Sequence, residues 1–293
     1  MNKRTFLQLA AAVTLGFSLT SFGQESKPIR VLLVDGQNNH SWKATTPLLK
    51  QALDSTGRFN VEVSTTPPQG APADAWAAWK PVFTSYDVVL SNYNGQLWPD
   101  AVRTDFEKYV ENGGGFVCVH AADNSFPEWL AYNRMIGIGG WNGRTEKSGP
   151  YLYIKDGESV RDLSPGAGGS HGDQHEFVVE VIDQKHPITA GMPPHWKHAK
   201  DELYDSLRGP AENVKVLAYA HSPRSGRNEP MMMVIDYGKG RVFHTPMGHA
   251  DYTLKCVGFQ STLQRGTEWA ATGKVTIPLP KEFPTAEAAL SRE

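Results

Sequence analysis

Three histidines stand where short apolar runs of the sequence end. His120 follows "GGGFVCV", His40 lies in "NNHSW" after "IRVLLVDG", and His249 lies in "PMGHADY" after "RVFHT". Imidazole titrates near neutral pH and is also a common metal ligand, so these residues suit acid–base catalysis or metal binding. Either chemistry requires a fold that brings the three side chains together.

Other candidate site residues fall in polar or glycine-rich segments. Glu202, in "KDELYDSL", is an acid between strand-like runs, and Tyr204 follows it. His171 ("GGSHGD") and Trp141 ("GGWNG") lie in a glycine-rich region that predicts long loops, and Asn94 follows the run "YDVVLSNY". Long loops of this kind are often functional, and a tryptophan within one can stack on a sugar ring.

No compact metal-binding motif is present: the sequence has neither a His-Glu-x-x-His helix nor a cluster of paired cysteines. A metal site would be assembled from distant segments, with imidazoles and one carboxylate of the kind that suits zinc or a similar divalent ion. The same side chains could transfer protons without a metal, so both interpretations stay open. The glycines at 137–140 and 238–240 lack the spacing of nucleotide-binding loops, and we expect no nucleotide cofactor.

Alternating strand and helix patterns predict the frame that positions these residues. The strands are expected at 29–36, 61–66, 86–93, 113–120, 176–183 and 214–221, with a hairpin turning at 238–240. Helices are expected around 48–53, from Pro99 to the glycines at 113, and over 253–271. This order predicts an α/β fold with a mainly parallel sheet and helices on both faces. Ligands bind beyond the carboxyl ends of such strands, where His120, His40 and Asn94 are expected.

The first residues predict the cellular compartment. Lys3 and Arg4 precede an apolar run that reaches Leu19, and the small residues Ser21 and Gly23 follow, which is the layout of a signal peptide. The alternative, a membrane anchor, needs about 20 apolar residues, more than this run offers. We therefore expect a periplasmic or secreted protein with no membrane span after signal removal.

The remaining composition sets limits on partners and domains. The chain has 293 residues and a formal net charge of −2, which offers no basic field for nucleic acid. We expect a signal peptide at 1–23, one α/β domain at 24–275 and a Pro-rich polar tail at 276–293. Two cysteines, Cys118 and Cys256, could form one disulfide, or Cys118 could be a small core residue within "FVCVH".

Several stretches taken together resemble the ThuA-like (trehalose-utilisation) family, within the class I glutamine amidotransferase-like superfamily. They span about 29–271 and are "VLLVDGQNNHSW", "YDVVLSNYNGQLW", "FEKYVENGGGFVCVHAA", "HEFVVEVIDQKHPITAGMP", "DELYDSL" and "GRVFHTPMGHADYTLKCVGFQSTLQRGTEWA". The ordered combination "HPITAGMP", "DELY" and "GH" is the most specific part. The resemblance implies a flavodoxin-like, class I glutamine amidotransferase-like sheet in the domain at 24–275.

The resemblance also implies which chemistry to expect. Amidotransferases of this superfamily place a catalytic cysteine on the turn after the "GGG" strand. Here that turn carries His120, and Cys118 comes two residues early, so a glutamine amidotransferase is not expected. The family is associated with glucosides oxidised to 3-keto forms, whose ketone acidifies the proton on the neighbouring carbon. A base can remove that proton, which leads to elimination, hydration or isomerisation.

The implied function is an exported lyase, hydrolase or isomerase that acts on a glycoside or 3-keto-sugar. The alternative is a non-catalytic sugar-binding or accessory protein of a glycan-utilisation system, and a residual amidohydrolase is a third interpretation. The expected partner is a small carbohydrate, and the expected cofactor is a divalent metal such as zinc. The predicted catalytic residues, which are also the predicted metal ligands, are His120, His249 and Glu202. The predicted substrate-binding residues are His40, Asn94, Trp141, His171 and Tyr204.

Overall fold

The computed structural model describes residues 27–292, so the predicted signal peptide lies outside the described residues. The strands are β1 (Ile29–Asp35), β2 (Phe59–Thr65), β3 (Val88–Ser91), β4 (Gly115–Val119), β5 (Tyr151–Lys155), β6 (Glu158–Asp162), β7 (Ser170–His171), β8 (His175–Val181), β9 (His195–Asp201), β10 (Tyr204–Asp205), β11 (Val214–His221), β12 (Asn228–Tyr237) and β13 (Gly240–Thr245). The α-helices are α1 (Trp42–Asp54), α2 (Ala73–Ala78), α3 (Asp100–Glu111), α4 (Leu130–Ile136), α5 (Asp251–Leu254) and α6 (Val257–Thr272). Short 3₁₀ turns are η1 (Phe83–Ser85), η2 (His120–Asn124) and η3 (Glu146–Ser148).

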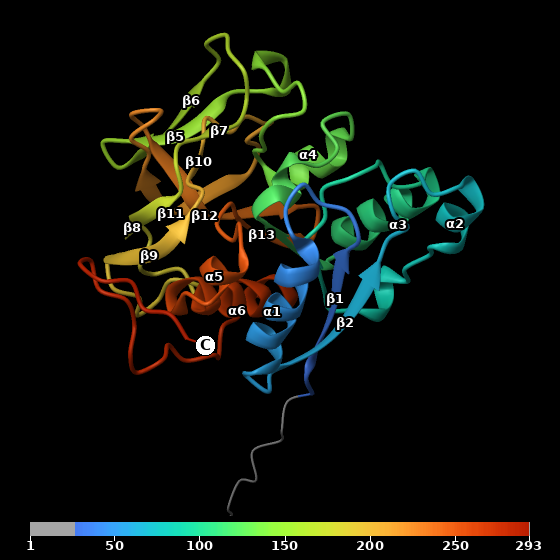
Figure 1. Cartoon of the computed structure of the whole chain (residues 1–293), viewed down its shortest axis with the longest axis horizontal. Coiled ribbons are helices and arrows are strands. Elements are labelled where there is room, and N and C mark those ends of the chain that lie inside the picture. Colours follow the sequence, from blue (N-terminus) through green and yellow to red (C-terminus); the bar gives the residue numbers. More distant parts are fainter. Residues whose placement is uncertain (1–26, 293) are drawn as a thin grey trace, which may run out of the picture.

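The main sheet has a parallel half and an antiparallel half, in the order β2-β1-β3-β4-β13-β12-β11-β8-β9 (Figure 1). The strands from β2 to β13 pair in parallel, whereas β12, β11, β8 and β9 pair antiparallel. The hairpin β5–β6 joins the sheet through β12, and β7 and β10 form a separate two-stranded sheet. The predicted α/β fold class is confirmed, as is the hairpin between β12 and β13. Within residues 27–292, every helix is too short or too polar to span a lipid bilayer.

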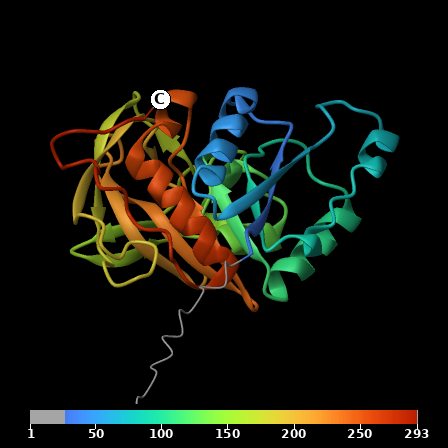
Figure 2. The same cartoon turned by 90° about the horizontal axis from the view of Figure 1, so that it is seen from below.

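Apolar side chains alternate between the two faces of the parallel strands and build a core on each. On one face Leu33 packs with Leu49 of α1 and Leu263 of α6. On the other face Leu32, which precedes Leu33 in β1, packs with Phe106 of α3. Figure 2 shows α1 and α6 together on one side of the sheet. Burial on both faces explains why the strands read as near-continuous apolar runs.

The last helical segment differs from its prediction. The sequence predicts one helix over 253–271, whereas α5 and α6 are separate helices that meet near Cys256. Cys256 has an extended backbone (φ −60°, ψ 125°), which interrupts the helical path and starts α6. Beyond α6, the segment 276–292 runs back along the molecule, and the Leu290 carbonyl accepts a hydrogen bond from the N–H of Val257 (2.8 Å).

A buried acid on β12 is expected to make stability depend on pH. Glu229 is 1% exposed, and burial raises the pKa of its carboxyl from 4.5 to about 7. The folded protein therefore keeps a proton that the unfolded chain has lost, and the free energy of unfolding falls as pH rises from about 4.5 to about 7. The free energy of unfolding of Glu229→Gln should therefore rise relative to that of the wild type, by on the order of 3 kcal/mol between about pH 4 and about pH 8. Denaturant unfolding at both pH values measures this gain, and a difference that is constant with pH would contradict it.

Candidate active site

The carboxyl ends of the parallel strands meet at one edge of the sheet, and the predicted histidines follow them. The loop after β1 carries His40, His120 follows β4 directly, and His249 lies just beyond β13. Because β1, β3, β4 and β13 are consecutive in the sheet, their loops lie side by side at this edge.

The acidic residue of the site, Glu202, follows a strand of the antiparallel half of the sheet. Glu202 lies between β9 and β10, and its Oε2 atom is 3.1 Å from His249 Nδ1, 3.6 Å from His120 Nε2 and 3.9 Å from His40 Nε2. One ligand atom from each of the four residues lies within 4.8 Å of the others. The structure thus brings the predicted trio together and adds His40, and we call these four residues the His3Glu cluster.

The turn after β4 directs His120 into the cluster. Its backbone is left-handed (φ +47°), which is uncommon for a residue other than glycine. The Nδ1 atom lies 2.7 Å from the Pro246 carbonyl and donates to it, while Nε2 is buried without a hydrogen-bond partner. This arrangement fixes the tautomer, so that the Nε2 lone pair faces Glu202.

The other two imidazoles of the cluster also contact polar side chains outside it. His249 Nδ1 is buried without a hydrogen-bond partner, and its Nε2 lies 3.0 Å from the side-chain amide of Gln174. The Gln174 atom that faces it is Nε2, and Gln174 Oε1 accepts from the Tyr252 hydroxyl. His249 Nε2 therefore accepts a hydrogen bond and the proton lies on Nδ1, 3.1 Å from Glu202 Oε2, where a bound cation would replace it. His40 Nε2 lies 3.2 Å from the Tyr204 hydroxyl and 3.0 Å from Asn39 Nδ2. Buried nitrogens that lack partners and face one carboxylate are groups that a bound cation would satisfy.

The protonation states of the cluster also favour a cation. Burial raises the pKa of Glu202, but His120 and His249 outweigh it and hold this pKa well below its usual range. Burial and the two neighbouring imidazoles lower the pKa of His40 to about 3, so His40 is neutral at neutral pH. Burial lowers the pKa of His120, yet Glu202 raises it above its usual value overall. The carboxylate of Glu202, the one acid within the cluster, thus attracts positive charge, and three imidazoles with one carboxylate form a donor set that fits zinc or a similar ion.

A cavity of about 250 Å³ opens beside the cluster, and we call it the site cavity. Tyr204 forms one wall, with its ring 4.2 Å from that of His120 and 4.5 Å from that of Trp141. β7 and β10 place His171 directly opposite Tyr204. The site cavity is lined by Asn39, His40, Asn94, Asn124, Trp141, Asn142, His171, Glu202 and Tyr204. All five residues predicted to bind substrate are among them.

Three asparagines of the site cavity were not singled out by the sequence analysis: Asn39, Asn124 and Asn142. Asn124 lies four residues after His120, and its Oδ1 is buried without a hydrogen-bond partner. Asn142 follows Trp141, and both have left-handed backbones (φ +48° and +52°). Their closeness in sequence to His120 and Trp141 is the one signal that could have identified them.

A second acid, Asp201, holds the backbone on which the cluster is built. It is fully buried, and its Oδ1 accepts hydrogen bonds from the N–H groups of Glu202 (2.8 Å) and His249 (3.1 Å). Its Oδ2 accepts from the N–H of Gly248 (2.8 Å) and from His198 Nε2 (2.9 Å). One carboxylate therefore joins the end of β9 to the loop after β13. This positioning role was also missed by the sequence analysis.

The two cysteines are unpaired and buried, and Cys118 lies inside β4. Burial raises the pKa of the Cys118 thiol well above its ordinary value, which disfavours the nucleophilic thiolate. We expect Cys118→Ala to lower the free energy of unfolding by about 1 kcal/mol and to leave turnover within a few-fold of the wild type. Steady-state kinetics of the folded variant checks this, and a loss of several orders of magnitude would restore Cys118 as a nucleophile.

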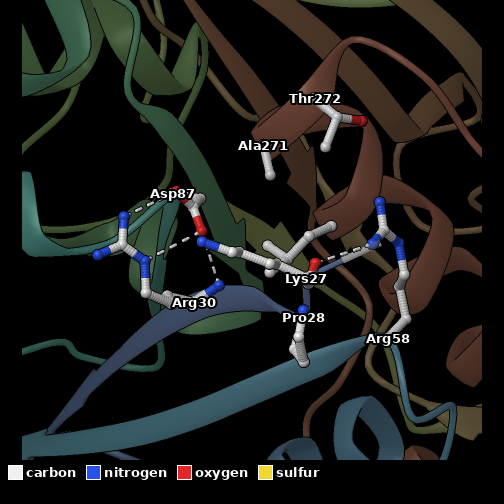
Figure 3. A pocket seen from close by; sticks show the side chains of 8 residues that line it. Lys27, Pro28, Arg30, Arg58, Asp87, Ala271 and Thr272 are labelled. Carbon is white, nitrogen blue, oxygen red and sulfur yellow. Dashed lines mark hydrogen bonds and ion pairs between the residues drawn. The ribbon is translucent and has the colours of Figure 1, made fainter. Parts of the chain in front are cut away.

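A cavity of about 620 Å³ lies at the opposite, amino-terminal edge of the strands (Figure 3). Its charged side chains include Arg30, which pairs with Asp87 (3.0 Å), and Arg58, which pairs with Glu268 (2.9 Å). These guanidinium groups are satisfied by carboxylates, in contrast to the unpartnered imidazole nitrogens at the carboxyl edge.

Comparison with known proteins extends these observations. The family model of ThuA, described as trehalose utilisation, matches residues 30–270. The solved structure of a ThuA-like protein from Parabacteroides merdae is 47% identical, and the match covers 91% of this chain and 98% of that chain with a TM-score of 0.88. The structure of a ThuA-like protein from Bacteroides uniformis is 21% identical, with 86% and 96% of the two chains covered and a TM-score of 0.55, and shows a shared fold. A comparison with curated proteins gave no match.

Proposed function

The chain belongs to the ThuA family, and on this premise we propose that it is an enzyme acting on a glycoside or 3-keto-sugar by metal-assisted acid–base chemistry. Family membership indicates a carbohydrate-related role. The observation that carries the finer proposal is the meeting of three imidazoles and Glu202 beside a polar cavity, which His40 and Glu202 line. We also propose that the protein is exported, on the basis of the basic, apolar and small residues of its first segment.

The four residues of the His3Glu cluster would hold the ion. A divalent ion bound there supplies Lewis-acid polarisation of a carbonyl oxygen, which acidifies the neighbouring C–H bond. Glu202 contributes the negative charge, and His120 and His249 contribute the buried nitrogens that lack partners. Without an ion, His120, His249 and Glu202 would transfer the proton themselves.

His171 is the imidazole of the site cavity that lies outside the cluster, and we assign it the proton-accepting role. Its Nδ1 lies 2.7 Å from the Gly172 carbonyl and donates to it, which leaves the Nε2 lone pair free. Nε2 lies 3.8 Å from Glu202 Oε1, and both residues line the site cavity. This distance places a candidate base next to the groups that polarise the ketone.

Elimination from a 3-keto-glucoside illustrates the proposed reaction. The proton on the carbon between the ketone and the glycosidic carbon passes to His171 Nε2. The electron pair of that C–H bond forms a carbon–carbon double bond to the glycosidic carbon. The glycosidic C–O bond breaks, and its electron pair leaves on the aglycone oxygen, which takes up a proton to become an alcohol. Trp141 and Tyr204 supply an aromatic wall for the ring, and Asn94 and Asn124 supply amides for its hydroxyl groups.

Metal analysis combined with a substrate panel tests this function. We expect about one divalent ion per purified chain, and turnover of a 3-keto-glucoside that is lost on chelation and regained when the ion is added back. Turnover that survives complete removal of the metal would contradict the metal-assisted route and favour the metal-free acid–base set. Sugar binding without turnover on any 3-keto-glucoside would favour the alternative, a non-catalytic sugar-binding protein.

A further inference from the structure

A second polar cavity, of about 490 Å³, adjoins the site cavity. Asn39, Asn94 and Asn142 line both cavities, so the two spaces share a wall. The site cavity alone, at about 250 Å³, is smaller than the roughly 300–1,000 Å³ of typical ligand sites, whereas the two together fall within that range. A ligand that reaches the cluster therefore has room to extend in one direction.

The second cavity is lined by uncharged amides and one indole, and we call it the amide cavity. Besides the three shared asparagines, Gln37, Asn38, Gln69 and Gln96 line it, together with Trp42. None of its lining residues is charged. An amide group has both a donor and an acceptor, and those that the protein's own hydrogen bonds leave free match a hydroxyl group, which is itself both. No lining side chain is a cation that would pair with a phosphate or carboxylate, and the ammonium of Lys43 lies 5.5 Å from the centre of the Trp42 ring, outside the lining. The lining of the amide cavity therefore favours a neutral polyol.

Several of these amides are fixed by the protein before any ligand arrives. Gln37 Nε2 donates to the Pro67 carbonyl (2.7 Å), and Gln37 Oε1 accepts from the N–H of Gln96 (3.0 Å). Asn94 Nδ2 donates to Asn39 Oδ1 (2.7 Å), which links the loops after β1 and β3. Side chains held in this way lose little further freedom when a ligand binds, which favours a binding site over a solvated surface.

We propose that the amide cavity is a subsite for a second, neutral sugar unit, next to the reacting unit in the site cavity. The ligand would then be a neutral disaccharide or longer glycoside, with Trp42 against the second ring. This inference rests on the proposed function only in placing a sugar in the site cavity. The subsite itself follows from the shared asparagines, the uncharged lining and the fixed amides.

Calorimetric binding to the metal-loaded protein tests the subsite without requiring turnover. The probes are trehalose, maltose and cellobiose, with glucose as the monosaccharide. We expect at least one disaccharide to bind about tenfold or more tightly than glucose. Trp42→Ala and Gln69→Ala should each reduce that ratio of affinities several-fold, because both residues line the amide cavity and not the site cavity.

Matched replacements elsewhere on the chain serve as controls. Trp76→Ala, in an apolar cavity between α2 and α3, and Gln51→Ala, exposed on α1, should leave the ratio unchanged. A ratio near one in the wild type, no binding of any disaccharide, or equal loss of disaccharide and glucose affinity in the Trp42 and Gln69 variants would overturn the subsite. A disaccharide preference in a protein that shows no turnover would support the subsite while removing the proposed catalysis.

Discussion

Replacing Glu202 with glutamine is expected to abolish stable binding of a divalent ion and to reduce turnover roughly 100-fold or more. Glutamine keeps the size of the side chain but removes the carboxylate charge that lies within 3.9 Å of all three imidazoles. Loss of an outer partner of a metal ligand already costs about 10–100-fold in affinity, and loss of an anionic ligand should cost more. Metal content after dialysis and zinc titration measure the first effect, and turnover of a 3-keto-glucoside measures the second.

A matched glutamate on the surface provides the control for this change. Glu212 is about half exposed, pairs with Arg134 (3.2 Å) and does not line the site cavity. Glu212→Gln should keep both the ion and the rate. If Glu202→Gln retained wild-type metal content and turnover, the His3Glu cluster would be neither a metal site nor a catalytic centre.

The histidines of the site could be predicted from the sequence because their positions follow from strand order. An apolar run that ends in a polar residue marks the carboxyl end of a parallel strand, and neighbouring ends share one edge. His40 and His120 follow β1 and β4 in this way, and His249 follows β13. The local sequence pattern and the α/β fold class are sufficient to predict these three positions.

The sequence indicated Glu202 as a candidate site residue, but the strand that places it in the site could not be predicted. It follows β9, whose sequence "HWKHAKD" lacks the clean alternation of apolar residues that marks a strand. β9 forms because it pairs with β8 at the end of the antiparallel half of the sheet. Long-range pairing of this kind overrides local propensity and leaves no periodic signal.

The hydrogen bonds that hold the site residues in place could not be predicted from the sequence for a similar reason. Asp201 joins residues that are 47 positions apart, and Asn124 reaches Tyr204 across 80 positions. Such contacts depend on side-chain direction in the folded chain, and no spacing rule encodes them.

Left-handed backbone conformations gather at this edge of the molecule. His120, Trp141 and Asn142 have φ values of +47°, +52° and +48°, although none is glycine. A residue held in this region costs on the order of 1–3 kcal/mol and persists only when its surroundings impose it. At the turn after β4, where the resemblance to the amidotransferase-like superfamily implies a catalytic cysteine, this chain presents the imidazole of His120.

Asp201→Asn is expected to lower the free energy of unfolding by roughly 3–5 kcal/mol and to weaken metal binding by about 10–100-fold. The Asp201 carboxylate accepts four hydrogen bonds, and an amide can accept at only one of its two ends. Burial lowers the pKa of His198, but Cys256 and Asp201 raise it to about 9, so the variant would also remove one of the two anionic partners of this buried imidazole. Thermal unfolding and zinc titration measure the two effects.

A second buried carboxylate separates this positioning role from simple loss of stability. Glu268 is buried on α6 and accepts hydrogen bonds from the N–H groups of Thr276 (2.7 Å) and Ile277 (3.0 Å), and it pairs with Arg58. Arg58 lines the cavity at the amino-terminal edge, away from the cluster (Figure 3). Glu268→Gln should therefore destabilise the fold by a comparable amount and leave zinc affinity unchanged. If Asp201→Asn lost stability but bound zinc as tightly as Glu268→Gln, the hydrogen bonds from Asp201 to Glu202 and His249 would have no part in shaping the site.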